Sequence, residues 1–394
     1  MATVYFTDLR AKPGRSLLDK IEDLLKRVKV AQKVRKNDLA AIKVHFGERG
    51  NCAYLRPVFL RVIADHLRAA GARPFLTDTN TLYTGSRSNG VTHMETAVLN
   101  GFDYAVAGCP VVIADGLRGA AGVRVAVPAG GVLRDVSIAR EIVDADALVV
   151  ATHFKGHELC GFGGALKNMG MGCATREGKL VQHSTVGPAI NVERCKGCGL
   201  CLDYCPQNAI SLKGGKEGEG AAGKAGADGA AEGGPLRRKG RRAMIEGHRC
   251  IGCGECIVVC PQGAIEIQWN EDQDRFQKKM VEHAAGVLAG KAGKAVFLNF
   301  LMQISPACDC YPSNDAPIVR DLGVLASADP VAVDAASVDM VNAQEALPGS
   351  VLKGAKAAGE DKFRAVYPTI DWNIQLDHAV KMGLGERTYR IVKI

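Results

Sequence analysis

Two cysteine series carry the clearest chemical signal in this 394-residue sequence. CKGCGLCLDYCP and CIGCGECIVVCP share the spacing C-x2-C-x2-C-x3-C-P. This spacing is typical of chains that hold two [4Fe–4S] clusters, because three close thiolates hold one cluster and the fourth reaches across to the other. The predicted ligands of the first cluster are Cys195, Cys198, Cys201 and Cys260, and those of the second cluster are Cys250, Cys253, Cys256 and Cys205.

A pair of zinc sites is the alternative interpretation of these cysteines. Zinc modules usually place their ligands in separated pairs, whereas each series here is a triplet followed by a Cys-Pro dipeptide. We therefore favour two iron–sulfur clusters. Such clusters carry single electrons and do no substrate chemistry by themselves.

A second group of reactive side chains lies in the glycine-rich loop HFKGHELCGFGGALKNMGMGC at 153–173. Lysines beside histidines indicate an anionic ligand, such as a carboxylate or a phosphate, with a proton donor next to it. A structural loop whose glycines serve only packing is the alternative. The earlier segment IKVHFGERG adds a lysine and a histidine after an apolar run. The predicted catalytic residues are Lys43, His45, Lys155, His157, Lys167 and His183.

The segment SPACDCYPSND contains a C-x-C pair, Cys308 and Cys310. These thiols could bind a third metal together with Cys160, Cys173 or a histidine. Free cysteines are also often small buried apolar residues, which is the simpler interpretation.

The surrounding elements predict an α/β fold with a mostly parallel sheet. Apolar runs at 39–45 and 145–154 indicate buried strands, and segments at 16–30 and 56–71 have the apolar spacing of helices. Open α/β sheets build their sites at the carboxyl ends of their strands, where the glycine-rich loop begins.

The organisation predicted is one α/β domain interrupted by a small α+β two-cluster insertion. The first part covers 1–186, the insertion covers 187–268 and the second part covers 269–394. Between the two cysteine series, 213–242 is rich in Gly, Ala, Lys and Glu and is predicted to be a flexible loop, because almost no large apolar residue offsets the entropy of ordering it.

Composition narrows the classes of function. The net charge is +8, yet only 5% of the residues are aromatic and no base-stacking motif is present, which argues against nucleic-acid binding. The longest apolar runs are too short to span a membrane. The start MATVYFTDLR lacks the apolar core of an export signal, and with metal-type cysteine spacing this predicts a reducing, cytoplasmic location.

The motifs KVHFGERGN, FLTDTNTLYTGSR, HFKGHELCGFGGALKNMGMGC, CDCYPSND and DPVAVDAAS together resemble the DUF362 family of iron–sulfur proteins. The resemblance covers nearly the whole chain, with the two-cluster module inserted. It implies a [4Fe–4S] redox protein and names no substrate.

A second, local resemblance concerns the glycine-rich loop alone. His157, GFGGALK ending at Lys167, and His183 are similar to a series in the lactate racemase (nickel-pincer) family, with His93 as a fourth member. That resemblance implies that the lysine tethers a cofactor, that one histidine binds nickel and that others shuttle protons. The proline after the family's lysine segment is replaced here by NMGMG.

Three functions are consistent with these residues. The leading hypothesis is an oxidoreductase whose clusters exchange electrons between a donor or acceptor protein and a small anionic substrate or second redox centre in the α/β domain. In it, His157 and His183 donate protons or bind metal, and Lys155 and Lys167 orient the substrate. The alternatives are an electron-transfer or assembly protein that docks a partner, and a nickel-pincer-type isomerase.

Overall fold

The computed structural model describes residues 1–214, 240–352 and 357–394. An eight-stranded sheet forms its centre, in the order β16-β1-β15-β14-β7-β2-β3-β4. Most of the predicted flexible loop at 213–242 lies outside the described residues. The strands of the sheet are β1 (Ala2–Asp8), β2 (Leu39–Lys43), β3 (Arg73–Asp78), β4 (Val111–Ile113), β7 (Ala147–His153), β14 (Ala295–Leu301), β15 (Gly323–Ser327) and β16 (Tyr389–Lys393).

The sheet is mostly parallel, as the sequence predicted. Strands β14, β7, β2, β3 and β4 pair in parallel with their neighbours, and β16 is parallel to β1. Only β15 runs against the other strands of this sheet, because both of its pairings are antiparallel. The carboxyl ends of β2, β3 and β7 therefore lie side by side at one edge of the sheet.

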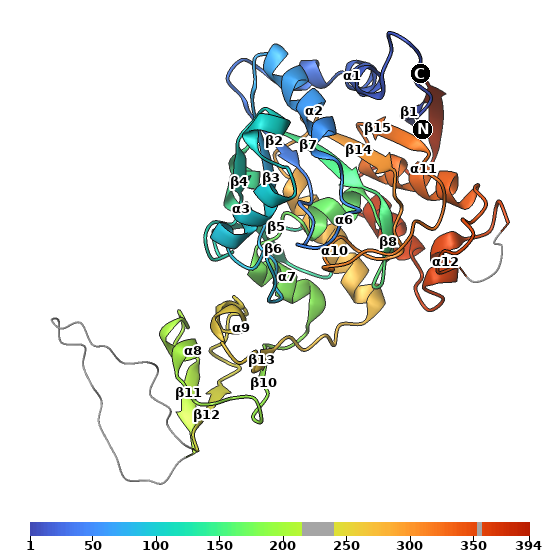
Figure 1. The fold of residues 1–394 in the computed structure, drawn as a ribbon. Helices are drawn as coiled ribbons and strands as arrows, with labels where there is room; N and C mark the ends of the chain where they lie inside the picture. Colours follow the sequence, from blue (N-terminus) through green and yellow to red (C-terminus); the bar gives the residue numbers. More distant parts are fainter. Residues whose placement is uncertain (215–239, 353–356) are drawn as a thin grey trace.

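Helices cover both faces of the sheet (Figure 1). Their ends follow local signals: Ser16 and Asp19 form a capping box at the start of α1, and Asp329 caps α11 by accepting from two backbone N–H groups. The helices outside the insertion are α1 (Leu17–Arg27), α2 (Pro57–Ala69), α3 (Gly90–Leu99), α4 (Tyr104–Ala107), α5 (Arg140–Asp144), α6 (Ala165–Gly170), α7 (Arg176–His183), α10 (Gln273–Leu288), α11 (Pro330–Asn342), α12 (Lys362–Val366) and α13 (Asn373–Lys381), with a 3₁₀ turn at Val30–Lys33.

Alternate residues of the central strand β7 supply two separate hydrophobic cores. Leu148 and Val150 join the core on one face of the sheet, whereas Val149 and Ala151 join the core on the other. A strand buried on both faces must be apolar throughout, which explains its continuous apolar sequence. Two small antiparallel hairpins lie outside the sheet: β5 (Gly122–Ala126) with β6 (Asp135–Ala139), and β8 (Lys155–His157) with β9 (Gly161–Gly163).

Between α7 and α10, the chain leaves the sheet and forms a smaller α+β unit (Figure 1). Its outer strands, β10 and β13, pair with each other, and so do its inner strands, β11 and β12. Each pairing joins a strand of one cysteine half to a strand of the other, so the two halves of the repeat interleave. The elements are β10 (Ala189–Ile190), α8 (Leu200–Asp203), β11 (Ile210–Lys213), β12 (Arg242–Ile245), α9 (Glu255–Val259) and β13 (Ile265–Glu266).

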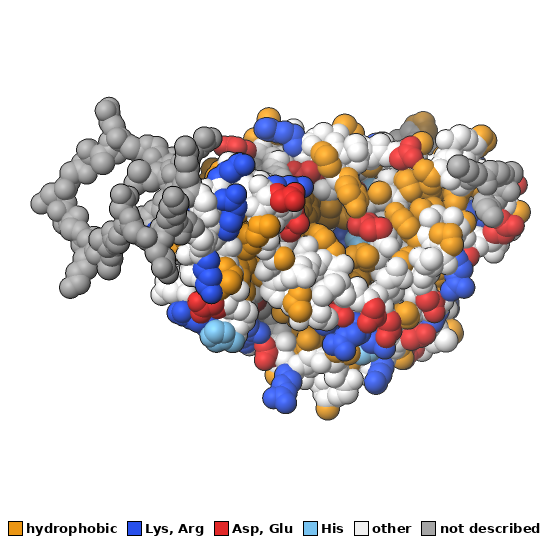
Figure 2. All heavy atoms as spheres, turned by 90° about the horizontal axis from the view of Figure 1, so that it is seen from below, with side chains coloured by type: hydrophobic (Ala, Val, Ile, Leu, Met, Phe, Trp, Pro, Cys, Tyr) orange, Lys and Arg blue, Asp and Glu red, His pale blue; other side chains and the backbone are white. Residues whose placement is uncertain are grey.

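A third, small hydrophobic core holds this unit together and joins it to the rest of the chain. It contains Cys195, Cys201 and Cys256, together with Leu82 and Leu180 from the α/β body. Seen from below, the surface of the molecule shows charged side chains interspersed with apolar ones (Figure 2). In the part of the chain that the structure describes, every helix is too short or too polar to cross a bilayer.

Candidate functional site

Two small cavities inside the α+β unit are each lined by four cysteines. One is lined by Cys195, Cys198, Cys201 and Cys260, and the other by Cys205, Cys250, Cys253 and Cys256. These are the two sets that the spacing predicted, including the exchange of the fourth cysteine between the halves. The interleaved pairing of the strands brings that exchange about.

The surroundings of these cysteines fit iron–sulfur clusters. Backbone N–H groups of Ala209 and Ala264 donate to the sulfur atoms of Cys205 and Cys260, both at 3.2 Å. Burial raises the pKa of the Cys256 thiol to about 12, and neighbouring thiols add to the effect. Bound iron is the group that would keep four close sulfurs ionised.

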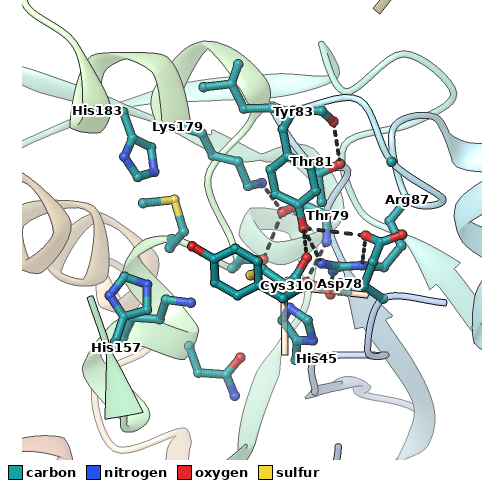
Figure 3. Close-up of a pocket in the computed structure, with 18 of the residues that line it drawn as sticks. His45, Asp78, Thr79, Thr81, Tyr83, Arg87, His157, Lys179, His183 and Cys310 are labelled. Carbon is teal, nitrogen blue, oxygen red and sulfur yellow. Dashed lines mark hydrogen bonds and ion pairs between the residues drawn. The ribbon is translucent and has the colours of Figure 1, made fainter. Parts of the chain in front are cut away.

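A cavity of about 790 Å³ lies at the carboxyl ends of the parallel strands. His45 follows β2, Thr79 follows β3, Lys155 and His157 follow β7, and His183 ends α7 (Figure 3). The position is the one at which open α/β sheets place their ligands. Five of the six predicted catalytic residues line it: His45, Lys155, His157, Lys167 and His183.

Lys43 is the sixth predicted catalytic residue, and it lies beneath the cavity wall. Its side chain is fully buried, its Nζ atom is 3.0 Å from an Asp78 carboxylate oxygen, and it donates to Asn168 Oδ1 at 2.7 Å. His93 is also buried, 3.8 Å from Asp78, and is absent from the cavity lining that the described residues form. Lys43 therefore pairs with Asp78 from outside the cavity, and His93 lies near the same carboxylate without a hydrogen bond to it.

The two cavity histidines have opposite electrostatic surroundings. Burial disfavours the charged form of His157, but Cys160 and Glu158 outweigh it and raise its pKa. Cys160 Sγ is 3.2 Å from His157 Nδ1. Burial lowers the pKa of His183 to about 3, with a further contribution from the nearby His157. The two imidazoles therefore lose their protons over different pH ranges, His157 at a higher pH than His183.

The two lysines predicted to orient an anionic substrate already have partners in the protein. Lys155 Nζ is 3.0 Å from Asp309, and Lys167 Nζ donates to Cys308 Sγ at 3.2 Å. Asp309 also lies 2.9 Å from His153 Nδ1. Although burial favours the protonated acid, His153 and Lys155 hold the pKa of Asp309 well below its usual range.

The sequence interpretation missed Lys179, which lines the same cavity. Its Nζ atom donates to the Thr79 hydroxyl at 2.5 Å and to the Ala174 carbonyl at 2.7 Å. Among the described residues, no carboxylate forms an ion pair with it. Burial lowers its pKa to about 8. The sequence does contain a pattern that points to Lys179. Lys179 and His183 are four residues apart on one helix, so they share a face of that helix.

Residues of the 79–88 segment were also missed, although FLTDTNTLYTGSR was recognised as a motif. Arg87 reaches Asp78 at 3.3 Å and Glu48 at 3.4 Å, and it donates to the Tyr83 hydroxyl at 2.9 Å (Figure 3). Tyr83 in turn donates to the carbonyl of Cys310 at 2.9 Å. This buried network holds one wall of the cavity rigid.

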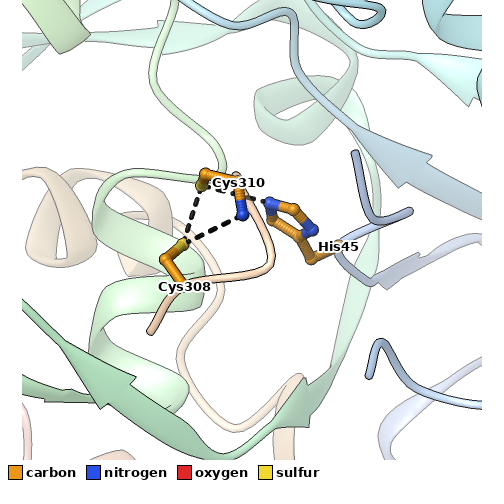
Figure 4. Close-up of side chains that lie close together, drawn as sticks. All are labelled: His45, Cys308 and Cys310. Atoms are coloured by element: carbon orange, nitrogen blue, oxygen red, sulfur yellow. Dashed lines mark hydrogen bonds between the residues drawn. The ribbon is translucent and has the colours of Figure 1, made fainter. Parts of the chain in front are cut away.

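The C-x-C pair lies at the cavity with His45, and neither Cys160 nor Cys173 joins it (Figure 4). Cys310 lines the cavity, whereas Cys308 is buried behind it. Cys160 contacts His157, and burial raises the pKa of Cys173 to about 12. The side chain next to the Cys308–Cys310 pair is therefore that of His45, which follows β2.

Helix α7 connects the cavity to the cysteine-lined unit. At its start, Arg176 donates to the Gly254 carbonyl at 2.7 Å and lies 3.8 Å from Glu255, both in the second cysteine series. At its end, His183 lines the cavity. Eight residues at 1.5 Å each span roughly 12 Å. Leu82 makes a second connection, because it lines the cavity and packs in the core that contains Cys256.

Comparison with known proteins identifies the family. Residues 40–339 match the family described as "Domain of unknown function (DUF362)", and the chain belongs to this family. Because the family is defined without a function, membership does not name an activity.

Part of the chain is similar to ferredoxins, which implies iron–sulfur clusters. It is 35% identical over 92 residues to "Putative ferredoxin-3" of Sinorhizobium fredii, covering 22% of this chain and 82% of that protein. It is 36% identical over 72 residues to "Ferredoxin-3" of Rhodobacter capsulatus, covering 18% and 70%, and 28% identical over 96 residues to "Pyruvate synthase subunit PorD" of Thermotoga maritima, covering 24% and 69%.

A solved structure of the lactate racemase apoprotein from Thermoanaerobacterium thermosaccharolyticum is also similar. The sequence identity is 13% and the TM-score is 0.35. The similarity covers 77% of this chain but only 51%, about half, of the racemase chain.

Proposed function

We propose that this protein is an iron–sulfur oxidoreductase. Two [4Fe–4S] clusters, held by the eight cysteines of the α+β unit, exchange electrons with a small anionic substrate in the cavity at the carboxyl end of the sheet. The observation that supports this proposal best is α7, because one short helix contacts the second cysteine series at its start and lines the cavity at its end. The ferredoxin relatives support the clusters.

The side chains of the cavity supply protons and charge. When bound, the clusters would supply single electrons. His157, whose pKa is raised, donates a proton, and His183, which burial keeps neutral, contacts the substrate without charge. Lys179 attracts the anion, since the charges of Lys155 and Lys167 are already balanced by Asp309 and Cys308.

A donor or acceptor protein completes the electron path in this proposal. It docks on the α+β unit, as expected for a chain with ferredoxin-like sequence. The cytoplasmic location stays a prediction from the sequence.

Anaerobic purification followed by metal analysis and EPR spectroscopy tests the proposal. We expect about eight irons per chain and reduced clusters that are reoxidised by at least one member of a panel of small carboxylates and phosphate esters. The variant Cys253→Ser, which removes a ligand of the second cluster, should lose this reoxidation. Cys52→Ser, at an exposed cysteine outside both cavities, is the control.

Two results would contradict the proposal in different ways. Colourless, iron-poor protein would rule out the clusters. Clusters that react with a partner protein and with no anion of the panel would instead make the chain an electron-transfer protein.

A further inference from the structure

Cys308 and Cys310 lie on one turn of the chain at the wall of the cavity. Their Sγ atoms are 2.7 Å apart, and the backbone N–H of Cys310 donates to Cys308 Sγ at 3.4 Å (Figure 4). We propose that the two cysteines form a redox-active dithiol–disulfide pair, which combines single electrons from the clusters into a two-electron step at the cavity. This inference rests on the proposed function of the clusters.

The separation of the two sulfur atoms is shorter than two thiolates adopt on one metal ion. Two thiolates on one tetrahedral zinc, each at about 2.3 Å, lie roughly 3.8 Å from each other. The observed 2.7 Å is closer to the S–S bond of about 2.05 Å that the pair would form on oxidation. The two thiols are therefore already positioned for that bond.

The hydrogen bonds of His45 also indicate a donor to sulfur and not a metal ligand. The backbone N–H of Gly47 donates to His45 Nδ1 at 3.0 Å, so Nδ1 is an acceptor. Burial, with Arg87 and Lys155 nearby, lowers the pKa of His45 well below its usual value and keeps the ring neutral. In a neutral imidazole the proton is then on Nε2, which faces Cys310 Sγ at 3.4 Å. Nε2 therefore has no lone pair to offer a metal and serves as a donor to sulfur.

The charges around Cys308 favour a thiolate, which is the reactive form in disulfide chemistry. The neighbouring Cys310 thiol, together with Lys167 and Lys155, lowers the pKa of Cys308 to about 6, in spite of its burial. Lys167 Nζ lies 3.2 Å from its sulfur. Lys167 and the backbone N–H of Cys310 both donate to Cys308 Sγ, so their contacts favour negative charge on this sulfur.

The redox step balances with two clusters. On oxidation, the S–H bond of Cys310 breaks, an S–S bond forms with the Cys308 thiolate, and two electrons and one proton are released. The two electrons would pass to the two clusters, one to each, and the proton leaves into the cavity that Cys310 lines. On reduction, the disulfide takes up one proton and two electrons, which the two clusters would supply, and the thiolate and thiol are restored.

Alkylation and mass spectrometry of the anaerobically purified protein test the pair. Trypsin releases both cysteines in one peptide, 295–320, which contains no other cysteine. After oxidation with ferricyanide and quenching, we expect this peptide to carry an internal disulfide and no alkyl group. After reduction with dithionite, the same peptide should carry two alkyl groups.

A reductive titration of cysteine variants, which counts the electrons taken up per chain, provides the matched comparison. Cys308→Ser and Cys310→Ser should each take up two fewer electrons per chain than the unchanged protein in a reductive titration, with the EPR signals of both clusters retained. Cys109→Ser, a buried cysteine outside both the cavity and the clusters, should not change the count.

The proposal is overturned if peptide 295–320 is alkylated at both cysteines under every condition. It is also overturned if one zinc or nickel ion per chain is retained and is lost in Cys310→Ser, since the pair would then be a metal site. A disulfide that dithiothreitol reduces but reduced clusters do not would overturn the relay through the pair, whereas reoxidation of the clusters by an anion would still support the proposed function.

Discussion

At the scale of single residues, the chemistry of the cavity depends on neighbours that shift the pKa values of His157 and His183 apart. Both rings are packed against Phe276, and His183 also contacts Trp269 edge-on. The difference arises from charge, because Cys160 and Glu158 contact His157 directly, whereas His157 and Lys167 act on His183 to lower its pKa further. Paired groups with separated pKa values are the usual arrangement for acid and base catalysis.

The first prediction concerns His157 as the proton donor. Below its raised pKa His157 is protonated and active, and as the pH rises through that pKa it loses the proton, so kcat should fall on the alkaline side. His157→Gln should lower kcat by about 10² to 10⁴-fold and remove this alkaline limb. The measurement is the pH profile of substrate-dependent cluster reoxidation.

The control for His157 is His66→Gln, at a histidine paired with Glu22 away from the cavity. A His157→Gln variant that keeps both the rate and the alkaline limb would show that the donated proton comes from another group.

The second prediction concerns Lys179 and anion affinity. Lys179 is charged below its pKa of about 8 and neutral above it, so the affinity for an anion should fall as the pH rises from 7 to 9. Linkage to one proton limits the decrease to about tenfold per pH unit above the pKa. Titration calorimetry with sulfate, whose own charge is constant in this range, measures it.

Two variants separate the charge of Lys179 from its volume. Lys179→Arg should keep the affinity nearly independent of pH, whereas Lys179→Met should bind weakly throughout. Lys291→Met removes another buried lysine, which donates to the carbonyls of Val143 and Ala145 outside the cavity, and should bind sulfate normally. Unchanged pH dependence in Lys179→Arg would exclude this lysine as the titrating group.

At the scale of elements, α7 positions the α+β unit against the cavity. Arg176 is the main polar contact, because its guanidinium donates to the Gly254 carbonyl and lies close to Glu255. Arg118 adds an ion pair to Glu255 at 3.6 Å and a cation–π contact with Tyr204 at 4.5 Å. Two arginines of the body thus hold a unit that contributes only a small core of its own.

The third prediction is that Arg176→Met loosens this contact without changing the cysteine cavities. Loss of a charge-assisted hydrogen bond costs about 1.5–3 kcal/mol. Backbone hydrogen exchange at 250–260 should therefore be accelerated by roughly ten- to a hundredfold, while the iron content stays the same. Mass-spectrometric exchange on the anaerobic protein measures the effect.

Arg124→Met is the matched control, since Arg124 is an exposed arginine whose partners, Asp135 and Glu177, belong to the body. Equal exchange at 250–260 in the Arg176→Met variant and the unchanged protein would mean that apolar packing through Leu82 and Leu180 is sufficient.

At the scale of the whole molecule, local patterns in the sequence predicted more than long-range contacts did. The parallel sheet and the capped helices α1 and α11 follow from signals within a few residues. The start of α6 does not: Gly164 offers no capping side chain, and Asp334 from α11 accepts from the backbone N–H groups of Ala165 and Leu166 at 2.7 and 2.9 Å. No pattern around Gly164 could reveal a partner 170 residues away.

The charged side chains of the cavity also have partners that local sequence patterns could not reveal. Types and spacing identified the lysines and histidines near strand ends, but not which of them are neutralised by distant residues. Lys155 pairs with Asp309, and Lys43 pairs with Asp78, across the fold. For this reason we propose Lys179, a residue on a helix that the sequence interpretation left undescribed, for the role predicted for Lys155 and Lys167.

The last prediction concerns removal of iron from the whole protein. The sheet-based body has two large cores of its own, whereas the core of the α+β unit consists partly of the cysteines themselves. Loss of iron leaves these thiols buried without the ions that would hold them together, so the unit should unfold alone. After chelation, hydrogen exchange should become fast in the described parts of 187–268, while β7 and β14 remain protected. Restoring iron and sulfide should reverse the change, and loss of protection in β7 at the same time would show that the body depends on the unit for its stability.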